Sequence, residues 1–201
     1  MTQHIKPTVK LALLVTISLG ATACFGTKPK NEYFYFLKAP AVAKANAKGV
    51  ALSVGDFTAS PGYTNQRIAY RERENELRYY AYRSWVSAPP ALMAAAVVRH
   101  MLASGRFSRV DRGERIKDPL ALLEGHIEAI EEIDKDNQTL AHLAMTFVLR
   151  DASSERELLR HSFDRTFPVT RRHPHDVAQA MSKLLNIELR RLADRIAQAV
   201  K

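Results

Sequence analysis

The chain contains a single cysteine, Cys24, among its 201 residues. One thiol cannot form a disulfide within the chain, so a folded domain must rely on packing alone, which 46% apolar residues make feasible. Long hydrophobic runs are also missing. The most apolar stretch, residues 11–20, is about half as long as the roughly 20 residues that a transmembrane helix needs. This stretch therefore does not predict a membrane-spanning helix.

Several signatures of catalysis are absent from the sequence as well. It has no G-x-S-x-G motif, no Walker loop and no G-x-G-x-x-G motif, which argues against serine hydrolases and nucleotide-binding enzymes that carry them. We therefore expect a protein that is not an enzyme and that binds no cofactor. A periplasmic hydrolase is an alternative that these absences disfavour.

Seven histidines raise the question of a metal site. His173 and His175 are separated by a proline, which hinders their convergence on one ion, so we expect a loop at the start of a helix there. His126 and His142 lie on neighbouring predicted strands, where exposed cross-strand polar pairs explain them more simply than a metal ion does. The sequence therefore predicts no metal site.

The N-terminal residues have the order of a secretory signal peptide. Basic residues precede the apolar stretch, and small residues at 21–23 follow it directly before Cys24. We expect a signal peptide at residues 1–23, a short lipidated tether at 24–31 and one folded domain at 32–201. An ordinary signal peptide followed by an incidental or buried cysteine is the alternative.

Residues 21–24, "ATAC", resemble the lipobox of bacterial lipoproteins, although Ala21 stands where leucine is usual. The resemblance implies that the sulfur of Cys24 carries a diacylglycerol and that the new N-terminus takes a further acyl chain such as palmitate. Two or three acyl chains hold a protein on a phospholipid membrane, because each buried CH₂ contributes about 0.8 kcal/mol. Phe25, in place of aspartate after the cysteine, favours the outer membrane, with the domain facing the periplasm.

The formal net charge is +9, of which Lys6 and Lys10 in the predicted signal peptide contribute two. An excess of arginine and lysine is compatible with a solvated surface, with anionic lipid headgroups or with an acidic partner protein. Nucleic acid would attract the same charge, but a secreted lipoprotein would not meet it. We therefore expect no nucleic-acid partner.

Alternation of apolar and polar residues predicts most of the strands. In the first half we expect four strands, then a helix that Ser87 caps and Gly105 ends, and a short strand after it. In the second half we expect three antiparallel strands and a long C-terminal helix that begins near Pro174. The predicted strands are 33–37, 50–57, 68–73, 76–85, 106–110, 123–133, 140–150 and 158–167, and the helices are 87–104 and 175–200.

The alternation also assigns side chains to faces. In the first strand of the second half, Leu123, Ile127 and Ile133 are expected on one face, and Glu128 and Glu132 on the other. Two groups of strands, each followed by a helix, predict an α+β fold in a single domain. Its mixed, largely antiparallel sheet would carry two main helices on one face.

The first predicted strand carries aromatic rings on both of its faces, in the sequence "YFYF" at residues 33–36. Strands that lie between helices and a sheet can be buried on both sides, and this is one explanation for the rings. The alternative is that one face meets another chain or an acyl chain.

The order of several short motifs resembles the ABC-type transport auxiliary lipoproteins, specifically the PqiC-like group. After the lipobox comes the aromatic strand, then a turn, a strand, a strand leading into the first helix, and the end of that helix. After the central tryptophan, Trp85, this sequence has Val86 and Ser87 where members commonly have an acidic or small-residue pattern. The motifs are "YFYFL" (33–37), "PGY" (61–63), "RIAYR" (67–71), "YRSWVSAPPALM" (82–93) and "LASGRFSRV" (102–110).

The resemblance implies a binding and scaffolding role without catalysis. Members are encoded with MCE-domain proteins and ABC permeases, and are thought to help MCE tunnels dock at the outer membrane so that lipid passes between membranes. Some relatives assemble into rings, so a homo-oligomer is compatible with the resemblance. The alternative function is that of a structural lipoprotein in an outer-membrane assembly or secretion complex.

Overall fold

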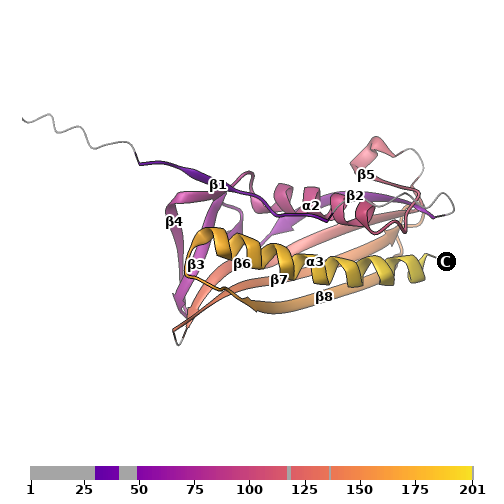
Figure 1. Ribbon diagram of the computed structural model, residues 1–201. Helices are drawn as coiled ribbons and strands as arrows, with labels where there is room; N and C mark the ends of the chain where they lie inside the picture. The colour runs from indigo at the N-terminus through magenta and orange to yellow at the C-terminus, as the bar shows by residue number, and fades with distance from the viewer. Residues whose placement is uncertain (1–29, 41–48, 117–118, 136, 201) are drawn as a thin grey trace, which may run out of the picture. The chain divides into compact units, whose positions relative to one another are not determined.

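The computed structural model describes residues 30–40, 49–116, 119–135 and 137–200. Residues Glu32–Lys201 form one compact unit (Figure 1). The predicted signal peptide and Cys24 lie outside the described residues, as does the predicted tether except its last two positions.

The strands and helices follow the order that the sequence predicts, which confirms the α+β class. The first half runs β1 (Tyr33–Tyr35), β2 (Ala51–Ala59), β3 (Arg67–Arg73), β4 (Glu76–Trp85), α2 (Pro89–Ala103) and β5 (Arg109–Arg112). The second half runs β6 (Ala121–Lys135), β7 (Gln138–Asp151), β8 (Glu157–Pro168) and α3 (Pro174–Ala199). Short 3₁₀ turns, η1 (Pro61–Tyr63) and η2 (Gly113–Arg115), lie in two of the connections.

Strand β6 organises the mixed sheet. Along one edge it pairs with β7 in a long antiparallel ladder, and β7 pairs in the same way with β8. Along its other edge it pairs in parallel with β2, from Leu52 opposite Ala121 onward, and then with β3, where Ala69 lies opposite Glu131. Strand β4 forms the predicted antiparallel hairpin with β3. Strand β1 pairs in parallel with β4, and β5 pairs in parallel with β2, so this part of the sheet has the strand order β1-β4-β3-β6-β2-β5.

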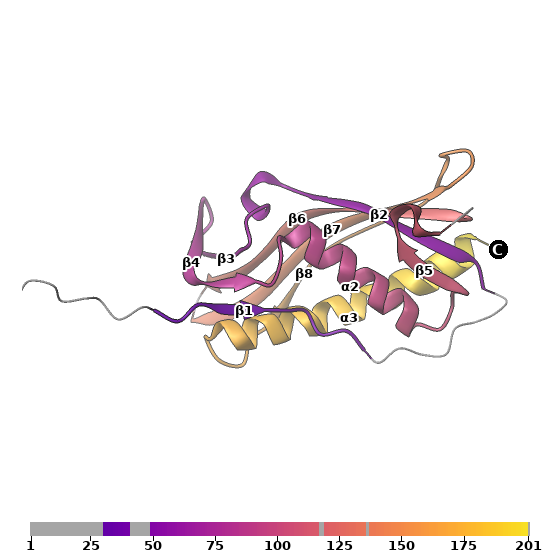
Figure 2. The same cartoon turned by 90° about the horizontal axis from the view of Figure 1, so that it is seen from above.

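Both helices pack on the same face of the sheet, as predicted. Helix α2 lies over β2 and β5, helix α3 lies over β7 and β8, and the two helices run side by side (Figures 1 and 2). Their apolar stripes and the facing strand residues form one core. Its fully buried members include Leu52, Val54, Trp85, Met93, Val97, Met101, Leu143, Met145, Phe147, Met181, Leu185 and Ile196.

The ends of α2 agree only in part with the sequence prediction. The N-cap residue is Ala88, which makes no side-chain capping bond, so the assignment of Ser87 as the cap was wrong. Proline at the first helical positions fixes φ and needs no N–H partner, so the helix can begin there without a polar cap. Gly105 follows the helix with φ of 65°, a left-handed conformation that favours glycine, and this confirms the predicted stop.

Strand β6 contains a β-bulge that reverses its alternation. The register with β7 shifts between Ile127 and Ala129, so that Ile130 pairs with Leu143 on the helix-covered face. Glu132 therefore lies on that face too, with its residue surface 0% exposed, and its predicted place on the face opposite Leu123 and Ile127 was wrong. One extra residue moves every later side chain to the opposite face.

Strand β1 is the outermost strand on the β4 side of the sheet. Its rings alternate: Tyr35 is half-buried and Leu37 is buried, whereas Phe34 and Phe36 are exposed. The explanation that both faces of this strand are buried was therefore wrong. Within the described chain the helices cover only one face of the sheet at this edge.

Candidate functional site

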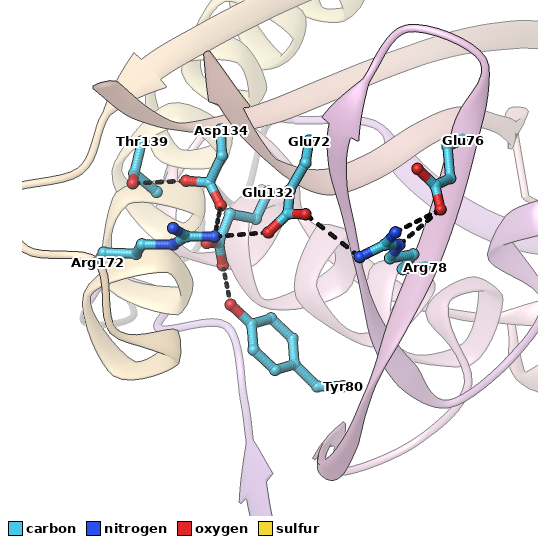
Figure 3. Close-up of polar contacts among 8 residues, drawn as sticks. All are labelled: Glu72, Glu76, Arg78, Tyr80, Glu132, Asp134, Thr139 and Arg172. Atoms are coloured by element: carbon cyan, nitrogen blue, oxygen red, sulfur yellow. Dashed lines mark hydrogen bonds and ion pairs between the residues drawn. The ribbon is translucent and has the colours of Figure 1, made fainter. Parts of the chain in front are cut away.

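Polar side chains gather at one end of the sheet, where β3, β6 and β7 meet the start of α3. They form two clusters, because neighbouring residues of β6 point to opposite faces of the sheet. We call the cluster on the helix-covered face the Arg172 cluster; its members are Glu72, Arg78, Tyr80, Glu132, Asp134, Thr139 and Arg172 (Figure 3). We call the cluster on the other face the Glu131 cluster; its members are Tyr63, Arg71, Glu131, His142 and Asp164.

Arg172, just before α3, joins the helix start to two strands. Its Nη2 lies 2.5 Å from Oδ2 of Asp134, at the end of β6, and 2.9 Å from Oε1 of Glu72, on β3. The hydroxyl of Thr139 donates a 2.7 Å hydrogen bond to the other oxygen of Asp134, and Arg78 of β4 approaches Glu72 at 3.3 Å. One guanidinium thus connects segments that are distant in the sequence.

Glu132 lies beneath this network and is fully buried. The Tyr80 hydroxyl donates a 2.9 Å hydrogen bond to its Oε2, while its Oε1 has no hydrogen-bond partner among the described residues. The pKa of Glu132 is raised to about 7, chiefly by burial and also by Asp134, against the hydrogen bond from Tyr80 and the positive charge of Arg172. Near neutral pH this carboxyl therefore changes between its protonated and ionised forms.

Glu131, the centre of the other cluster, is also buried but has three partners. The Tyr63 hydroxyl donates at 2.8 Å, Nδ1 of His142 lies at 2.8 Å, and Arg71 forms an ion pair with it. Burial opposes its ionisation, yet the bonds from His142, Tyr63 and Arg71 outweigh burial and lower the pKa of Glu131.

His142 faces a carboxylate with each ring nitrogen, since Nε2 lies 2.9 Å from Oδ1 of Asp164. Burial disfavours its charge, but the bonds to Glu131 and Asp164 prevail and raise the pKa of His142. The Glu131 cluster is therefore a set of compensated charges that connects η1, β3, β6, β7 and β8. This arrangement stabilises the sheet and leaves no unpaired base on Glu131.

An open groove of about 650 Å³ lies beside the Arg172 cluster. It runs along the ends of β6, β7 and β8, with Lys135, Gln138 and Thr170 among its lining residues. Small-molecule sites are usually enclosed and mostly apolar, whereas this groove is open and polar. Its shape suits contact with a larger partner better than enclosure of a substrate.

The structure separates the histidines that the sequence singled out. His173 caps α3, because its Nδ1 accepts a 3.1 Å hydrogen bond from the backbone N–H of His175, which confirms the helix-start interpretation. His126 and His142 lie on neighbouring strands as expected, but His126 is opposite Thr146 and His142 is opposite Glu131. The two imidazoles therefore do not form a pair.

His126 is the histidine closest to a catalytic arrangement. Its ring nitrogens lie 2.7 Å from the hydroxyl oxygen of Thr58 and 3.3 Å from that of Ser60. A catalytic triad needs a carboxylate on the second nitrogen to orient the imidazole, and here both nitrogens face hydroxyls. Within residues 30–40, 49–116, 119–135 and 137–200, no three His, Cys, Asp or Glu side chains are placed to hold a metal ion.

Neither polar cluster was predicted from the sequence. One feature of the sequence could have done so: Glu131 and Glu132 are adjacent in a long strand, so they point to opposite faces, and at least one must face the helices. The partners Arg71 and Arg172 are far away in the sequence, and only the sheet order brings them to this end.

Exposed hydrophobic side chains concentrate at a different place, along β1 and the end of β4. We call this set the aromatic edge: Tyr33, Phe34, Phe36, Tyr82 and Val86, which are 45%, 56%, 65%, 42% and 49% exposed. They account for five of the seven large hydrophobic side chains that are exposed in the described chain. The guanidinium of Arg83 stacks 3.8 Å from the ring centre of Tyr33 and donates a 3.1 Å hydrogen bond to the Tyr35 hydroxyl.

Solved structures share this fold at low sequence identity. Protein XCC0632 from Xanthomonas campestris is 19% identical, with a TM-score of 0.73, and the match covers 83% of this chain and 95% of that one. A second crystal structure, of an uncharacterized protein, is 10% identical with a TM-score of 0.68 over 83% of this chain and 99% of that one. Such similarity shows the fold alone.

A dodecamer of PelC from Paraburkholderia phytofirmans is more distant, at 16% identity and a TM-score of 0.45 over 77% of this chain and 96% of that one. No curated protein matches the chain by sequence. Neither described helix is both long enough and apolar enough to cross a membrane.

The comparison with models of protein families identifies the family of this chain. The model of the ABC-type transport auxiliary lipoprotein component matches residues 35–197, from β1 almost to the end of α3. This range contains both polar clusters and most of the aromatic edge. The chain therefore belongs to the family of ABC-type transport auxiliary lipoprotein components.

Proposed function

We propose that this protein is a non-enzymatic docking component of an ABC-type system that transports lipid between membranes. It would be anchored in the outer membrane through acyl chains on Cys24, face the periplasm and bind the end of an MCE-domain tunnel. The observation that supports this proposal most directly is the family match over residues 35–197. The sequence of the first 24 residues supports the anchor, because the one thiol of the chain follows an apolar stretch and small residues.

The geometry of the polar clusters supports binding rather than catalysis. In the Arg172 cluster the guanidinium compensates Asp134 and Glu72, and in the Glu131 cluster Arg71 and His142 compensate the central carboxylate. Charges that are already paired hold elements together, but they are not available as nucleophile or base. The one carboxyl oxygen of these clusters without a partner, Oε1 of Glu132, belongs to a residue that is 0% exposed and so is out of reach of a substrate. A rigid domain with paired charges suits a scaffold that presents its surface to a partner.

The test is capture of the partner from the native envelope. The tagged full-length protein would be produced in its own cells, extracted in mild detergent and purified, and the co-purifying proteins identified. The control is a fusion of residues 1–31 to an unrelated periplasmic domain, which keeps the proposed anchor and loses the folded unit. We expect an MCE-domain protein with the full chain and not with the control. Recovery of unrelated envelope proteins alone would contradict the proposal.

The alternative, a structural lipoprotein of an outer-membrane assembly or secretion complex, predicts different neighbours in the genome. Genes for a permease, an ATPase and an MCE-domain protein beside this one would favour lipid transport. Genes for a pilus or a secretion apparatus would favour the alternative.

A further inference from the structure

We propose that the aromatic edge inserts into the headgroup layer of the phospholipid bilayer to which the protein is anchored. This inference rests on the proposed lipid anchor, and it adds a second membrane contact, made by the folded domain itself. The occupant of the aromatic edge would be the interface of the bilayer. A second copy of the chain and the partner protein are the competing occupants, and the experiment below separates them.

The rings of the aromatic edge are unusually exposed. Phe34 and Phe36 are 56% and 65% exposed, although burial of an apolar ring of this size is favourable. Scattered exposed hydrophobic residues are common, but a contiguous set marks a binding surface. Because Phe34 lies opposite Ser84 in the β1–β4 register, it shares its face with Tyr82, two residues before Ser84. Phe34 and Tyr82 therefore lie on one face of the sheet, while Tyr33, opposite Arg83, lies on the other, so exposed rings are present on both faces of this edge.

The residue types of the aromatic edge suit a membrane interface. Tyrosine is enriched at membrane interfaces, where its ring enters the apolar layer and its hydroxyl stays among the headgroups. On the face that carries Tyr33, Arg83 places its guanidinium over this ring, and Lys38 is exposed two residues after Phe36. Cations next to interfacial rings are attracted to anionic phospholipids. Binding to a purely apolar protein surface would not require these two cations.

The chain between Cys24 and the aromatic edge is short. Tyr33 follows Cys24 by nine positions, which span at most about 30 Å when fully extended. With Cys24 at the membrane surface, the aromatic edge would be the first part of the folded unit along the chain and would remain within this distance of the bilayer. Tethering raises the local concentration, so even a weak interfacial contact would be occupied.

The test uses the mature chain, residues 24–201, with Cys24→Ala, so that no acyl chain contributes to binding. Its partitioning to vesicles of phosphatidylethanolamine and phosphatidylglycerol would be measured by flotation. The double variant Phe34→Ser/Phe36→Ser is compared with Leu120→Ser/Ile187→Ser, which changes two side chains that are similarly exposed, 48% and 41%, outside the aromatic edge. Thermal unfolding of both variants should match that of the parent, because all four side chains are exposed.

We expect the Phe34/Phe36 variant to bind vesicles about tenfold more weakly and the Leu120/Ile187 variant to change by less than about twofold. Equal loss in the two variants, or no vesicle binding by the parent, would overturn the inference. A Phe34/Phe36 variant that keeps vesicle binding but loses self-association in sedimentation, or loses capture of the MCE-domain protein, would assign the edge to one of the competing occupants.

The result is independent of the proposed anchor and partner. The protein in the flotation assay carries no acyl group, and the vesicles contain no other protein. Failure of Cys24 to be acylated in cells, or failure to capture a partner, would therefore leave the vesicle result as it stands and would count against the proposed function instead.

Discussion

The buried carboxyl of Glu132 makes the stability of the fold depend on pH in a predictable direction. Its pKa rises from 4.5 in the unfolded chain to about 7 in the folded protein, which corresponds to roughly 3 kcal/mol at 1.36 kcal/mol per pKa unit. The folded state binds this proton more tightly, so the contribution is fully present below pH 4.5 and is lost as the pH rises through about 7.

The substitution Glu132→Gln should remove this dependence. Glutamine is nearly isosteric with the protonated acid, can accept the hydrogen bond from Tyr80 and cannot ionise. We expect the variant to gain roughly 3 kcal/mol relative to wild type between about pH 5 and about pH 8, as the wild-type carboxyl ionises within the core. Urea unfolding followed by the fluorescence of Trp85, the single tryptophan, which is 1% exposed, gives the free energy of unfolding at each pH.

The matched control is Glu124→Gln, the same change on the same strand at a side chain that is 43% exposed and paired with Arg150. It should leave the pH dependence close to that of wild type. Parallel pH curves for wild type and Glu132→Gln would refute the reasoning, and so would a variant that loses stability relative to wild type as the pH rises.

Three further substitutions test the structure. Glu131→Gln should lower the free energy of unfolding near neutral pH by about 3 kcal/mol, because Arg71 and His142 lose their charged partner. In urea titrations this deficit should shrink as the pH falls and the wild-type carboxyl protonates, and a deficit that grows would contradict the ion-pair explanation. Trp85→Ala should cost about 3–5 kcal/mol in calorimetry, since it leaves a core cavity, and a near-neutral effect would contradict its burial. Gly105→Ala should lower the melting temperature by an amount equivalent to about 1 kcal/mol, because φ is positive there, and no change would argue against that conformation.

The order of elements could be predicted because its signals are local. Alternation along β7 and β8 identifies strands within a window of ten residues, and Gly105 marks the end of α2 without reference to the rest of the chain. The same periodicity predicts which side chains of these strands lie on the helix-covered face of the sheet. These features needed no knowledge of which strands are neighbours.

The polar clusters and the exposed rings could not be predicted in this way. The bulge between Ile127 and Ala129 inserts one residue without a signal in the pattern, and it alone moves Glu132 into the core. Arg172 meets its partners only because β3 and the end of β6 lie side by side. The exposure of Phe34 depends on the helices covering only the other face of the sheet at this edge, and that is a property of the tertiary packing.

The most direct test of the proposed membrane-anchored role is metabolic labelling of the native protein with a fatty acid. Wild type and Cys24→Ala would be produced in the original cells at equal levels, and the label on the purified proteins compared. We expect label on the wild type and none on the variant. Label that persists on Cys24→Ala, or an unlabelled wild type free in the periplasm, would contradict anchoring at Cys24.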